Sequence, residues 1–256
     1  MNRNDFSFRR MQRIVESNVF KGITSSKPDY DDPILQDFIS RFMDPPSQRQ
    51  RKFSNNDMII SRQLKVLEQV MNVSKGGFFV ECGANDGERN SNSDYLETVH
   101  KWAGFLAEPD ISFYTQLIGK NRRAWSINAG LSPDNFTSLL TYTEDSYGAG
   151  NVIGNLKGQS KYSVPCFTLH ALMYSLNVTT IDFFSLDVEG VELGVLKTID
   201  FSKINIRTLT VEFLTDEQRV LILNFLTKNG FKLYQTVVGK YPFAHDLFFV
   251  NENLSL

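Results

Sequence analysis

Short runs of apolar, β-prone residues alternate along this chain with stretches in which apolar residues recur every three or four positions. The first pattern predicts buried strands, and the second predicts helices that pack one face against a sheet. Their alternation is typical of an α/β protein with a largely parallel sheet. The predicted strands are residues 78–82, 104–108, 123–130, 137–143, 162–166, 181–187 and 208–214, followed by an antiparallel pair at 231–237 and 246–250.

Helical periodicity fills the intervals between these strands. The helix after the first strand has Ser91 as its N-cap and places Leu96, Val99 and Trp102 on one face. Further helices are predicted at 57–72, 111–120 and 216–228.

Residues 1–65 precede the regular alternation, and we expect them to form a partly helical, partly disordered extension to a domain at 66–256. The basic residues at 9–13 lie among apolar ones and suit either an amphipathic helix or a solvated arm. Residues 145–158 are rich in glycine, asparagine and serine and lack apolar periodicity. Loops of this kind are often functional, so we expect a lid or a substrate-side loop there.

Composition limits the classes of function that the chain can have. With 256 residues, 41% of them apolar, the chain can bury one large core. Its net charge of 27 − 29 = −2 gives no field that attracts nucleic acid or an anionic membrane. No apolar run approaches the roughly 18 residues of a transmembrane span, so we expect a soluble chain, cytoplasmic by default. Cys82 and Cys166 have neither metal nor disulfide spacing and are expected to be buried free thiols.

The first strand ends in a turn that carries Gly83 and Gly87. A strand, a glycine turn and a helix open the nucleotide site of a doubly wound sheet. The third glycine of a dinucleotide site is missing, and Glu81, Asp86 and Glu88 make the turn acidic. Such a turn suits a cationic, hydroxyl-rich ligand, and S-adenosylmethionine has this chemistry. The alternative is an ordinary connection between a strand and a helix.

Two further strand ends carry polar side chains. Glu108 ends the second strand 25 residues beyond Gly83, where an acid of a Rossmann-like sheet binds ribose hydroxyls. Asn128 follows the third strand, where it could contact the base or sugar of a ligand or form a turn before Gly130.

A second acidic cluster follows the strand at 181–187. Asp187 and Glu189 precede Gly190, and close carboxylates are costly unless they face a ligand, a metal or solvent. The alternative is that these acids interact favourably with the positive end of the dipole of the next helix. A divalent metal held with His245 or Asp246 is also conceivable, but the spacing is not diagnostic and we predict no metal site.

Three segments, 80–87, 106–109 and 186–192, resemble the signatures of the FkbM-type methyltransferase domain, and the resemblance covers residues 75–250. It implies a class I Rossmann-like fold, with a seven-stranded, mostly parallel sheet, helices on both faces and an antiparallel C-terminal strand pair. It also implies S-adenosylmethionine as cofactor and O-methyl transfer to an unidentified small-molecule, glycan or protein acceptor.

The resemblance implies a role for each matching residue. Asp187 and Glu189 would lie beside the transferring methyl group as catalytic residues, and Glu108 would hold the ribose. The expected cofactor-binding residues are Glu81, Gly83, Asn85, Asp86, Gly87, Glu108, Asn128 and Asp187.

A narrower resemblance concerns residues 31–33, 91–93, 102–109 and 120–125, which are similar to the animal branch related to the protein Star, a membrane-anchored trafficking factor. It implies an alternative function, a non-catalytic module that binds a secretory cargo protein in the endoplasmic reticulum, Golgi or endosome. This chain opens without the anchor of that branch, so the compartment is left open.

Overall fold

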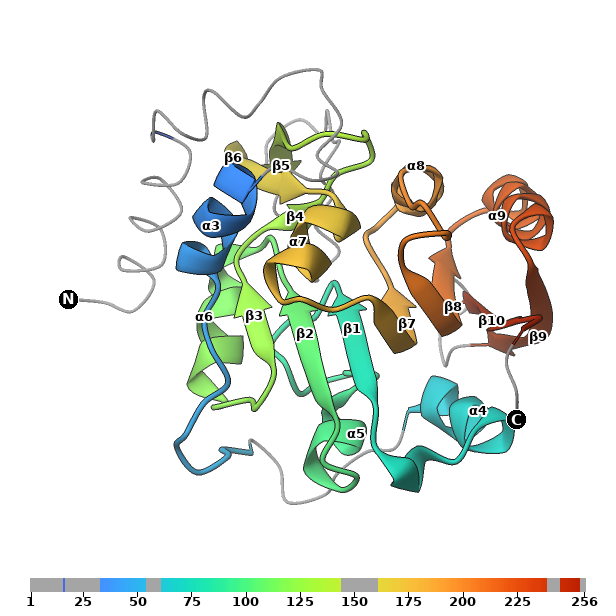
Figure 1. The fold of residues 1–256 in the computed structure, drawn as a ribbon, viewed down its shortest axis with the longest axis horizontal. Coiled ribbons are helices and arrows are strands. Elements are labelled where there is room, and N and C mark those ends of the chain that lie inside the picture. The colour runs from blue at the N-terminus through green and yellow to red at the C-terminus, as the bar shows by residue number, and fades with distance from the viewer. Residues whose placement is uncertain (1–15, 17–32, 54–60, 144–160, 239–244, 254–256) are drawn as a thin grey trace.

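The computed structural model describes residues 16, 33–53, 61–143, 161–238 and 245–253. The basic stretch at 9–13 and the loop at 145–158 lie outside these residues, so the lid expected there stays a prediction. Within the described part, strands and helices alternate and form two sheets, the larger of which is covered by helices (Figure 1).

Seven strands form the larger sheet in the order β3-β2-β1-β7-β8-β10-β9. Neighbours from β3 to β8 pair in parallel, while β10 runs antiparallel between β8 and β9. The predicted mostly parallel sheet with an antiparallel C-terminal pair is confirmed. The strands are β1 (Phe78–Cys82), β2 (Ala103–Ala107), β3 (Trp125–Ile127), β7 (Thr180–Leu186), β8 (Asn205–Phe213), β9 (Phe231–Val238) and β10 (His245–Asn251).

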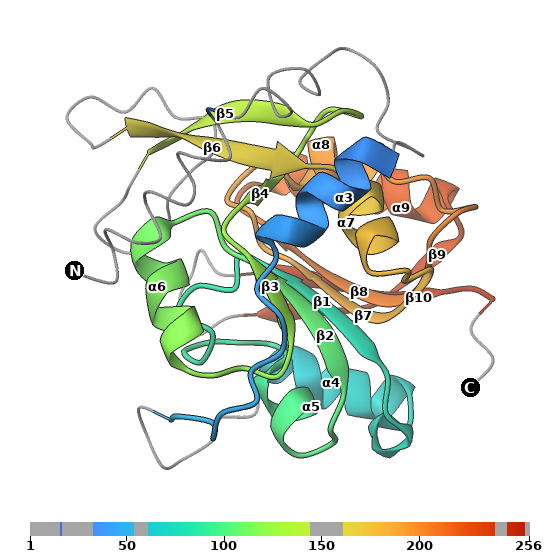
Figure 2. The same cartoon turned by 60° about the vertical axis from the view of Figure 1, so that its left-hand side comes forward.

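Apolar side chains of the central strands alternate between two cores, one on each face of the sheet. In β1, Val80 and Cys82 belong to the larger core and Phe79 to the smaller one. Helices therefore cover both faces (Figure 2). Those of the larger core are α3 (Pro33–Phe42), α7 (Leu169–Ser175), α8 (Glu192–Lys197) and α9 (Asp216–Lys228), and those of the smaller core are α4 (Arg62–Val70), α5 (Asp94–Thr98) and α6 (Ile111–Gly119).

The helix after β1 is shorter than predicted. It ends at Thr98, because the chain reverses at Lys101, with a φ of 60°, to enter β2. Val99 is consequently 45% exposed, so its predicted inward position is wrong. Trp102 is buried as expected, and its indole N–H donates to the carbonyl of Val73 in the 3₁₀ turn η1 (Val73–Lys75) at 2.7 Å.

A second, three-stranded sheet lies beyond the carboxyl ends of β1, β2 and β3 (Figure 1). Its strands are β4 (Gly130–Leu131), β5 (Ser138–Thr143) and β6 (Lys161–Phe167), in the order β4-β6-β5. The strand expected at 123–130 is thus split between the two sheets. Tyr142 of β5 is buried against Tyr162 of β6, with ring centroids 5.3 Å apart, while Leu139 faces solvent.

The described part of the predicted extension packs against the domain. α3 contributes its inner face to the larger core, and residues 43–53, the N-terminal strap, follow the edge of the sheet. Asp44 pairs with Ser126 of β3 through backbone hydrogen bonds of 2.7 and 3.0 Å, and the Lys52 N–H donates to the carbonyl of Lys120 at 2.9 Å. The domain boundary expected after residue 65 stays a prediction.

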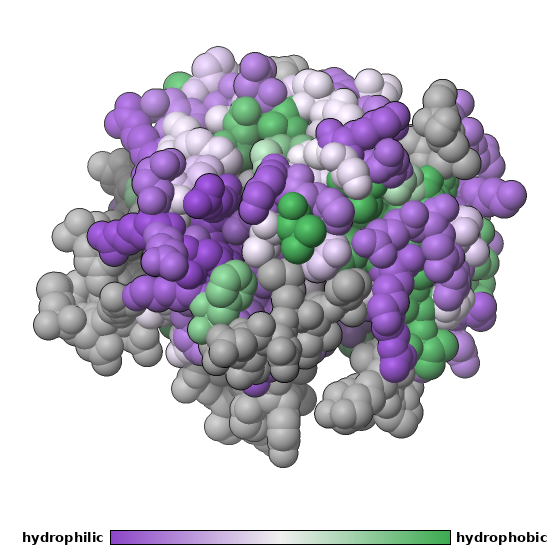
Figure 3. Space-filling model, turned by 90° about the horizontal axis from the view of Figure 1, so that it is seen from below, coloured by the Kyte–Doolittle hydropathy of each residue, from purple (hydrophilic) through white to green (hydrophobic). Residues whose placement is uncertain are grey.

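The amino ends of the parallel strands lie at the opposite end of the molecule from the small sheet. This face is largely hydrophilic, with small hydrophobic patches (Figure 3). An open groove there is lined by residues 68–76 together with His100 and Arg207. Among the described residues, no helix has both the length and the apolar character needed to cross a membrane.

Candidate functional site

The glycine turn, residues 83–87, leaves the carboxyl end of β1 between β2 and β7. Gly83 has a φ of 82°, and a Cβ atom there would lie 1.9 Å from the carbonyl oxygen of Asp187. The N–H groups of Gly83 and Ala84 both donate to the Ala107 carbonyl at 3.1 Å, and the Asp187 N–H donates to the Cys82 carbonyl at 3.1 Å. Only glycine fits between the neighbouring strand ends, so the sequence fixes the turn at this point.

Asp86 shapes the turn from within. Its Oδ1 accepts the N–H groups of Glu88 and Arg89 at 3.0 and 2.7 Å. Gly87, with a φ of 75°, lies against Leu117 of α6, where an added Cβ would come within 2.9 Å of the side chain. Neither Asp86 nor Gly87 lines the cavity beside the turn, so their contact with a cofactor stays a prediction.

Glu81, the penultimate residue of β1, binds the segment that follows the turn. Its carboxylate accepts the Ser91 hydroxyl at 2.8 Å, the Asn92 N–H at 2.7 Å and the Ser93 hydroxyl. Burial raises the pKa of Glu81, while the charge of Arg122 and these donors oppose the rise. The carboxylate thus holds the wall of the cavity in place as well as lining it.

Glu108 joins the ends of β1 and β2. Its carboxylate accepts the N–H groups of Asn85 and Asp110, both at 2.7 Å. Burial raises the pKa of Glu108 to about 8, although the two donors favour the ionised form. Asn128 lies behind it and donates its Nδ2 to the carbonyls of Glu108 and Pro109 at 2.8 and 3.1 Å. Asn128 therefore positions the end of β2 from outside the cavity.

Glu192 holds the loop that follows β7. Glu189 and Gly190 have φ values of 58° and 106° and turn the chain toward α8. The buried carboxylate of Glu192 accepts the N–H of Val188 at 3.1 Å and the N–H of Gly190 at 3.0 and 3.1 Å. Glu192 thereby fixes the loop that carries Asp187 and Glu189 into the cavity.

β8 adds a third carboxylate to this loop. Leu186 of β7 pairs with Val211 of β8, so the next residues, Asp187 just after β7 and Glu212 near the end of β8, lie side by side. Carboxylate oxygens of Asp187, Glu189 and Glu212, which we name the acid triad, lie within 4.8 Å of one another. Burial, together with repulsion between these groups, raises the pKa of Asp187 to about 8 and that of Glu212 to about 11. The pair therefore retains a proton near neutral pH.

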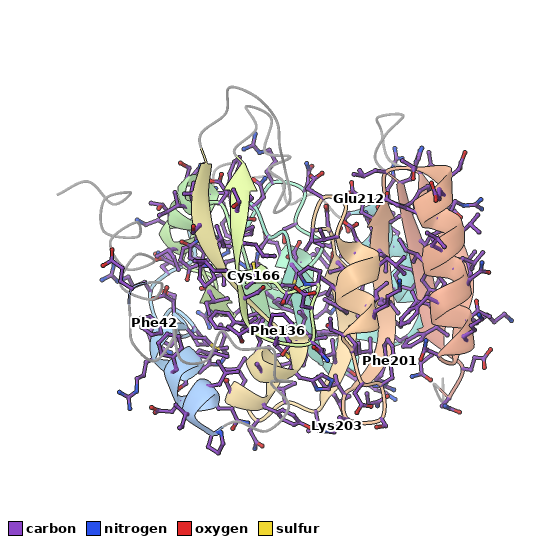
Figure 4. All side chains as sticks on the ribbon, turned by 90° about the horizontal axis from the view of Figure 1, so that it is seen from above. Phe42, Phe136, Cys166, Phe201, Lys203 and Glu212 are labelled. Atoms are coloured by element: carbon purple, nitrogen blue, oxygen red, sulfur yellow. The ribbon has the colours of Figure 1, made fainter. Side chains whose placement is uncertain are left out.

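Sequence reasoning placed Glu212 on a strand but gave it no role. The sequence signal for a role of Glu212 was its place as an acid near the carboxyl end of a parallel strand. That signal was not sufficient, because the sequence does not show which strands are neighbours. Glu212 is labelled in the view of the molecule from above (Figure 4).

A cavity of about 390 Å³ opens at the carboxyl ends of β1, β2 and β7. Its apolar part includes Phe113, Leu131 and Tyr142, and Arg89 lies at its rim. Of the residues that the sequence predicted for the site, Glu81, Gly83, Asn85, Glu108, Asp187 and Glu189 line this cavity, whereas Asp86, Gly87 and Asn128 do not.

Among the described residues, the acid triad is the group whose oxygens could hold a cation. The sequence analysis considered His245 or Asp246 as further metal ligands, but the Asp246 carboxylate accepts a hydrogen bond from the Gln63 side-chain amide at 2.8 Å. Hard cations such as Mg²⁺ bind oxygen ligands of this kind. An acidic cluster is not by itself a metal site, and we assign no ion to it.

Buried ion pairs hold the glycine turn from behind. The Arg122 side chain is 2% exposed, and its guanidinium donates to Glu97 at 2.8 Å and to the Gly87 carbonyl at 2.6 Å. Arg51 of the N-terminal strap donates to Asp94 of α5 at 2.7 Å. These contacts tie the turn, α5 and the strap into one charged network.

The strand order and the site at the carboxyl ends of the parallel strands define a Rossmann-like methyltransferase fold. The model of the methyltransferase FkbM domain matches residues 81–233, more than half of the 256 residues. The chain therefore belongs to the FkbM methyltransferase domain family. No curated protein matches the sequence.

Several solved structures are similar. TrmK of M. capricolum, in complex with S-adenosylhomocysteine, is 11% identical, with a TM-score of 0.46 over 77% of this chain and 70% of that one. The FkbM methyltransferase of Methylobacillus flagellatus KT is 13% identical, with a TM-score of 0.45 over 97% and 62%. Magnesium protoporphyrin IX methyltransferase of Synechocystis PCC 6803, with bound S-adenosylmethionine, is 12% identical, with a TM-score of 0.42 over 98% of each chain. At these TM-scores the likenesses add no argument to the family match.

Proposed function

We propose that this chain is a methyltransferase that uses S-adenosylmethionine and transfers the methyl group to a hydroxyl oxygen of an acceptor. The observation that carries the proposal is the cavity at the ends of β1, β2 and β7, lined by the glycine turn and by carboxylates, in a chain of the FkbM family.

The chemistry of the cavity supports this cofactor. Its carboxylates suit the sulfonium and ammonium groups, which are both cationic. Glu108, at the end of β2, lies where an acid of this fold accepts the two ribose hydroxyls. Phe113, Leu131 and Tyr142 offer an apolar surface for a base.

The acid triad supplies the proton chemistry. When bound, the cofactor supplies a methyl group attached to a positively charged sulfur. Asp187 would accept the proton of the acceptor hydroxyl as the methyl group passes from the sulfur to that oxygen. Glu212 retains its proton and donates it in a hydrogen bond to Asp187, which favours the ionised form of Asp187, and the positive charge of the bound cofactor would lower the pKa of Asp187 from about 8 so that its carboxylate can act as the base. Holding donor and acceptor in line accounts for much of the rate enhancement.

The alternative, a Star-like trafficking module, finds no support in the family match. The cavity and its carboxylates favour the enzyme. The module becomes the better explanation only if the chain binds no cofactor.

Calorimetric titration of the chain with S-adenosylmethionine and S-adenosylhomocysteine tests the proposal. We expect micromolar binding of both, weakened at least about tenfold in Glu108→Ala because a charged hydrogen-bond acceptor is lost. Glu217→Ala, which removes an exposed carboxylate on α9, is the matched control and should bind like the parent. A folded parent that binds neither ligand contradicts the proposal.

Oxygen as the acceptor atom is tested separately. The chain is incubated with S-adenosylmethionine labelled with carbon-13 in the methyl group and with hydroxyl-bearing compounds. The chemical shift of the transferred carbon distinguishes a methyl ether or ester from a methylated nitrogen. A product labelled on nitrogen would overturn the O-methyl assignment but not the cofactor.

A further inference from the structure

One cationic side chain lines the cavity among several carboxyl groups. Four carboxylates line it, those of Glu81, Glu108, Asp187 and Glu189. Among the described lining residues, Arg89 is the one cationic side chain. S-Adenosylmethionine carries an anion of its own, the carboxylate of its amino-acid part. The carboxyl groups of the wall that ionise when the cationic cofactor binds would repel that group, which needs a positive partner or free N–H donors.

Most backbone N–H groups of the two walls do not meet this need, because the chain uses them itself. Those of residues 83–89 and 91–93 donate to carbonyl or side-chain acceptors of the protein. On the opposite wall, the N–H groups of Val188 and Gly190 donate to Glu192. Both walls of the cavity are therefore poor in backbone donors for an anion.

Arg89 has donors to offer at the rim. Its side chain is 65% exposed, and its guanidinium lies 3.8 Å from Asp86, a long contact that contributes little in water. Asp86 already accepts two backbone N–H groups, which include the N–H of Arg89 itself. The backbone of Arg89 is thus anchored to the turn while the guanidinium is able to reach a ligand.

We propose that Arg89 binds the carboxylate of the amino-acid part of S-adenosylmethionine, an inference that rests on the proposed function. A guanidinium matches a carboxylate through two parallel N–H···O bonds, a geometry that lysine does not reproduce. Arg89 would then orient the cofactor by holding its carboxylate at the rim of the cavity.

The test compares S-adenosylmethionine with decarboxylated S-adenosylmethionine, which keeps the sulfonium, the ammonium and the nucleoside. Calorimetry measures both ligands with the parent, with Arg89→Gln, with Arg89→Lys, and with Arg123→Gln, which removes an exposed arginine outside the cavity lining. Circular dichroism and thermal unfolding check that each variant is folded.

We expect Arg89→Gln to weaken S-adenosylmethionine about tenfold and decarboxylated S-adenosylmethionine less than about twofold. Arg89→Lys should fall between the parent and Arg89→Gln, and Arg123→Gln should match the parent. Equal losses for the two ligands, or no loss for either, overturn the assignment of Arg89 while the cofactor proposal stands. A folded parent that binds neither ligand overturns both.

Discussion

Asp187 and Glu212 lie side by side at the carboxyl ends of neighbouring parallel strands, and their carboxyl groups are close enough together to titrate as one unit. Neither strand alone creates this relationship. It arises because the register of β7 and β8 places Asp187 beside Glu212, so that two partly buried acids lie next to each other. The consequences concern both stability and ligand binding.

Stability should fall as the pH rises. Asp187, Glu108 and Glu212 bind their protons more tightly in the folded than in the unfolded chain, since burial raises each pKa. Their contribution is complete below the unfolded pKa values of about 4 and is lost as the pH passes the folded values, the first near pH 8. Urea unfolding at about pH 5.5, 7 and 8.5 should show a decrease of a few kcal/mol.

Glu212→Gln should flatten this dependence, because one of the coupled groups no longer titrates. Glu217→Gln on the surface of α9 is the control and should leave the slope unchanged. A stability that rises between pH 5.5 and 8.5 would show that these buried carboxyls are ionised in the folded protein.

Cofactor binding should release protons at neutral pH. A cationic ligand beside Glu108 and Asp187 favours their ionised forms and lowers both pKa values from about 8. The binding enthalpy of S-adenosylmethionine should therefore depend on the ionisation enthalpy of the buffer. Identical enthalpies in phosphate and in Tris at pH 7 would mean that the carboxyls do not change protonation.

Arg122 and Arg123 form a matched pair, since they are adjacent and differ in burial. Arg122→Ala should lower the free energy of unfolding by about 3–5 kcal/mol, because it leaves the buried Glu97 carboxylate without its cation. Arg123→Ala removes an exposed side chain and should cost less than about 0.5 kcal/mol. Urea unfolding measures both, and similar costs would contradict the buried network.

Substitutions at Gly83 and Gly230 distinguish two costs to stability, steric overlap and backbone strain. Both have φ near 80°, but a Cβ on Gly230 meets nothing within 4 Å. Gly230→Ala should therefore cost about 1–2 kcal/mol from the left-handed backbone alone. Gly83→Ala adds the overlap with the Asp187 carbonyl and should cost about 3 kcal/mol or more and abolish cofactor binding. Equal losses in thermal unfolding would mean that the strand ends move apart at little cost.

The sequence was sufficient for features that depend on local pattern. The strand at β1, its glycines and the acid at the end of β2 follow from periodicity and spacing, and a cavity lies at these strand ends, although its use as a cofactor site stays a prediction. The C-terminal antiparallel pair is likewise confirmed, with β10 between β8 and β9.

Features that depend on strand neighbours and on buried partners were not available from the sequence. Glu212 acquires its place only when β8 lies next to β7. Nothing in the two consecutive arginines at 122 and 123 shows that the first is buried in an ion network and the second is exposed. Asp86 and Glu192 are acids of the motifs whose carboxylates accept backbone N–H groups, a use that residue type alone does not reveal.

The position of β10 also sets an order of assembly. β9 is synthesised before β10, yet among the described strands it pairs only with β10, which inserts between it and β8. During translation, β8 and β9 therefore present open edges until residues 245–251 emerge. Open edges of this kind recruit other extended chains, so the nascent protein passes through an interval in which a chaperone would protect it from aggregation.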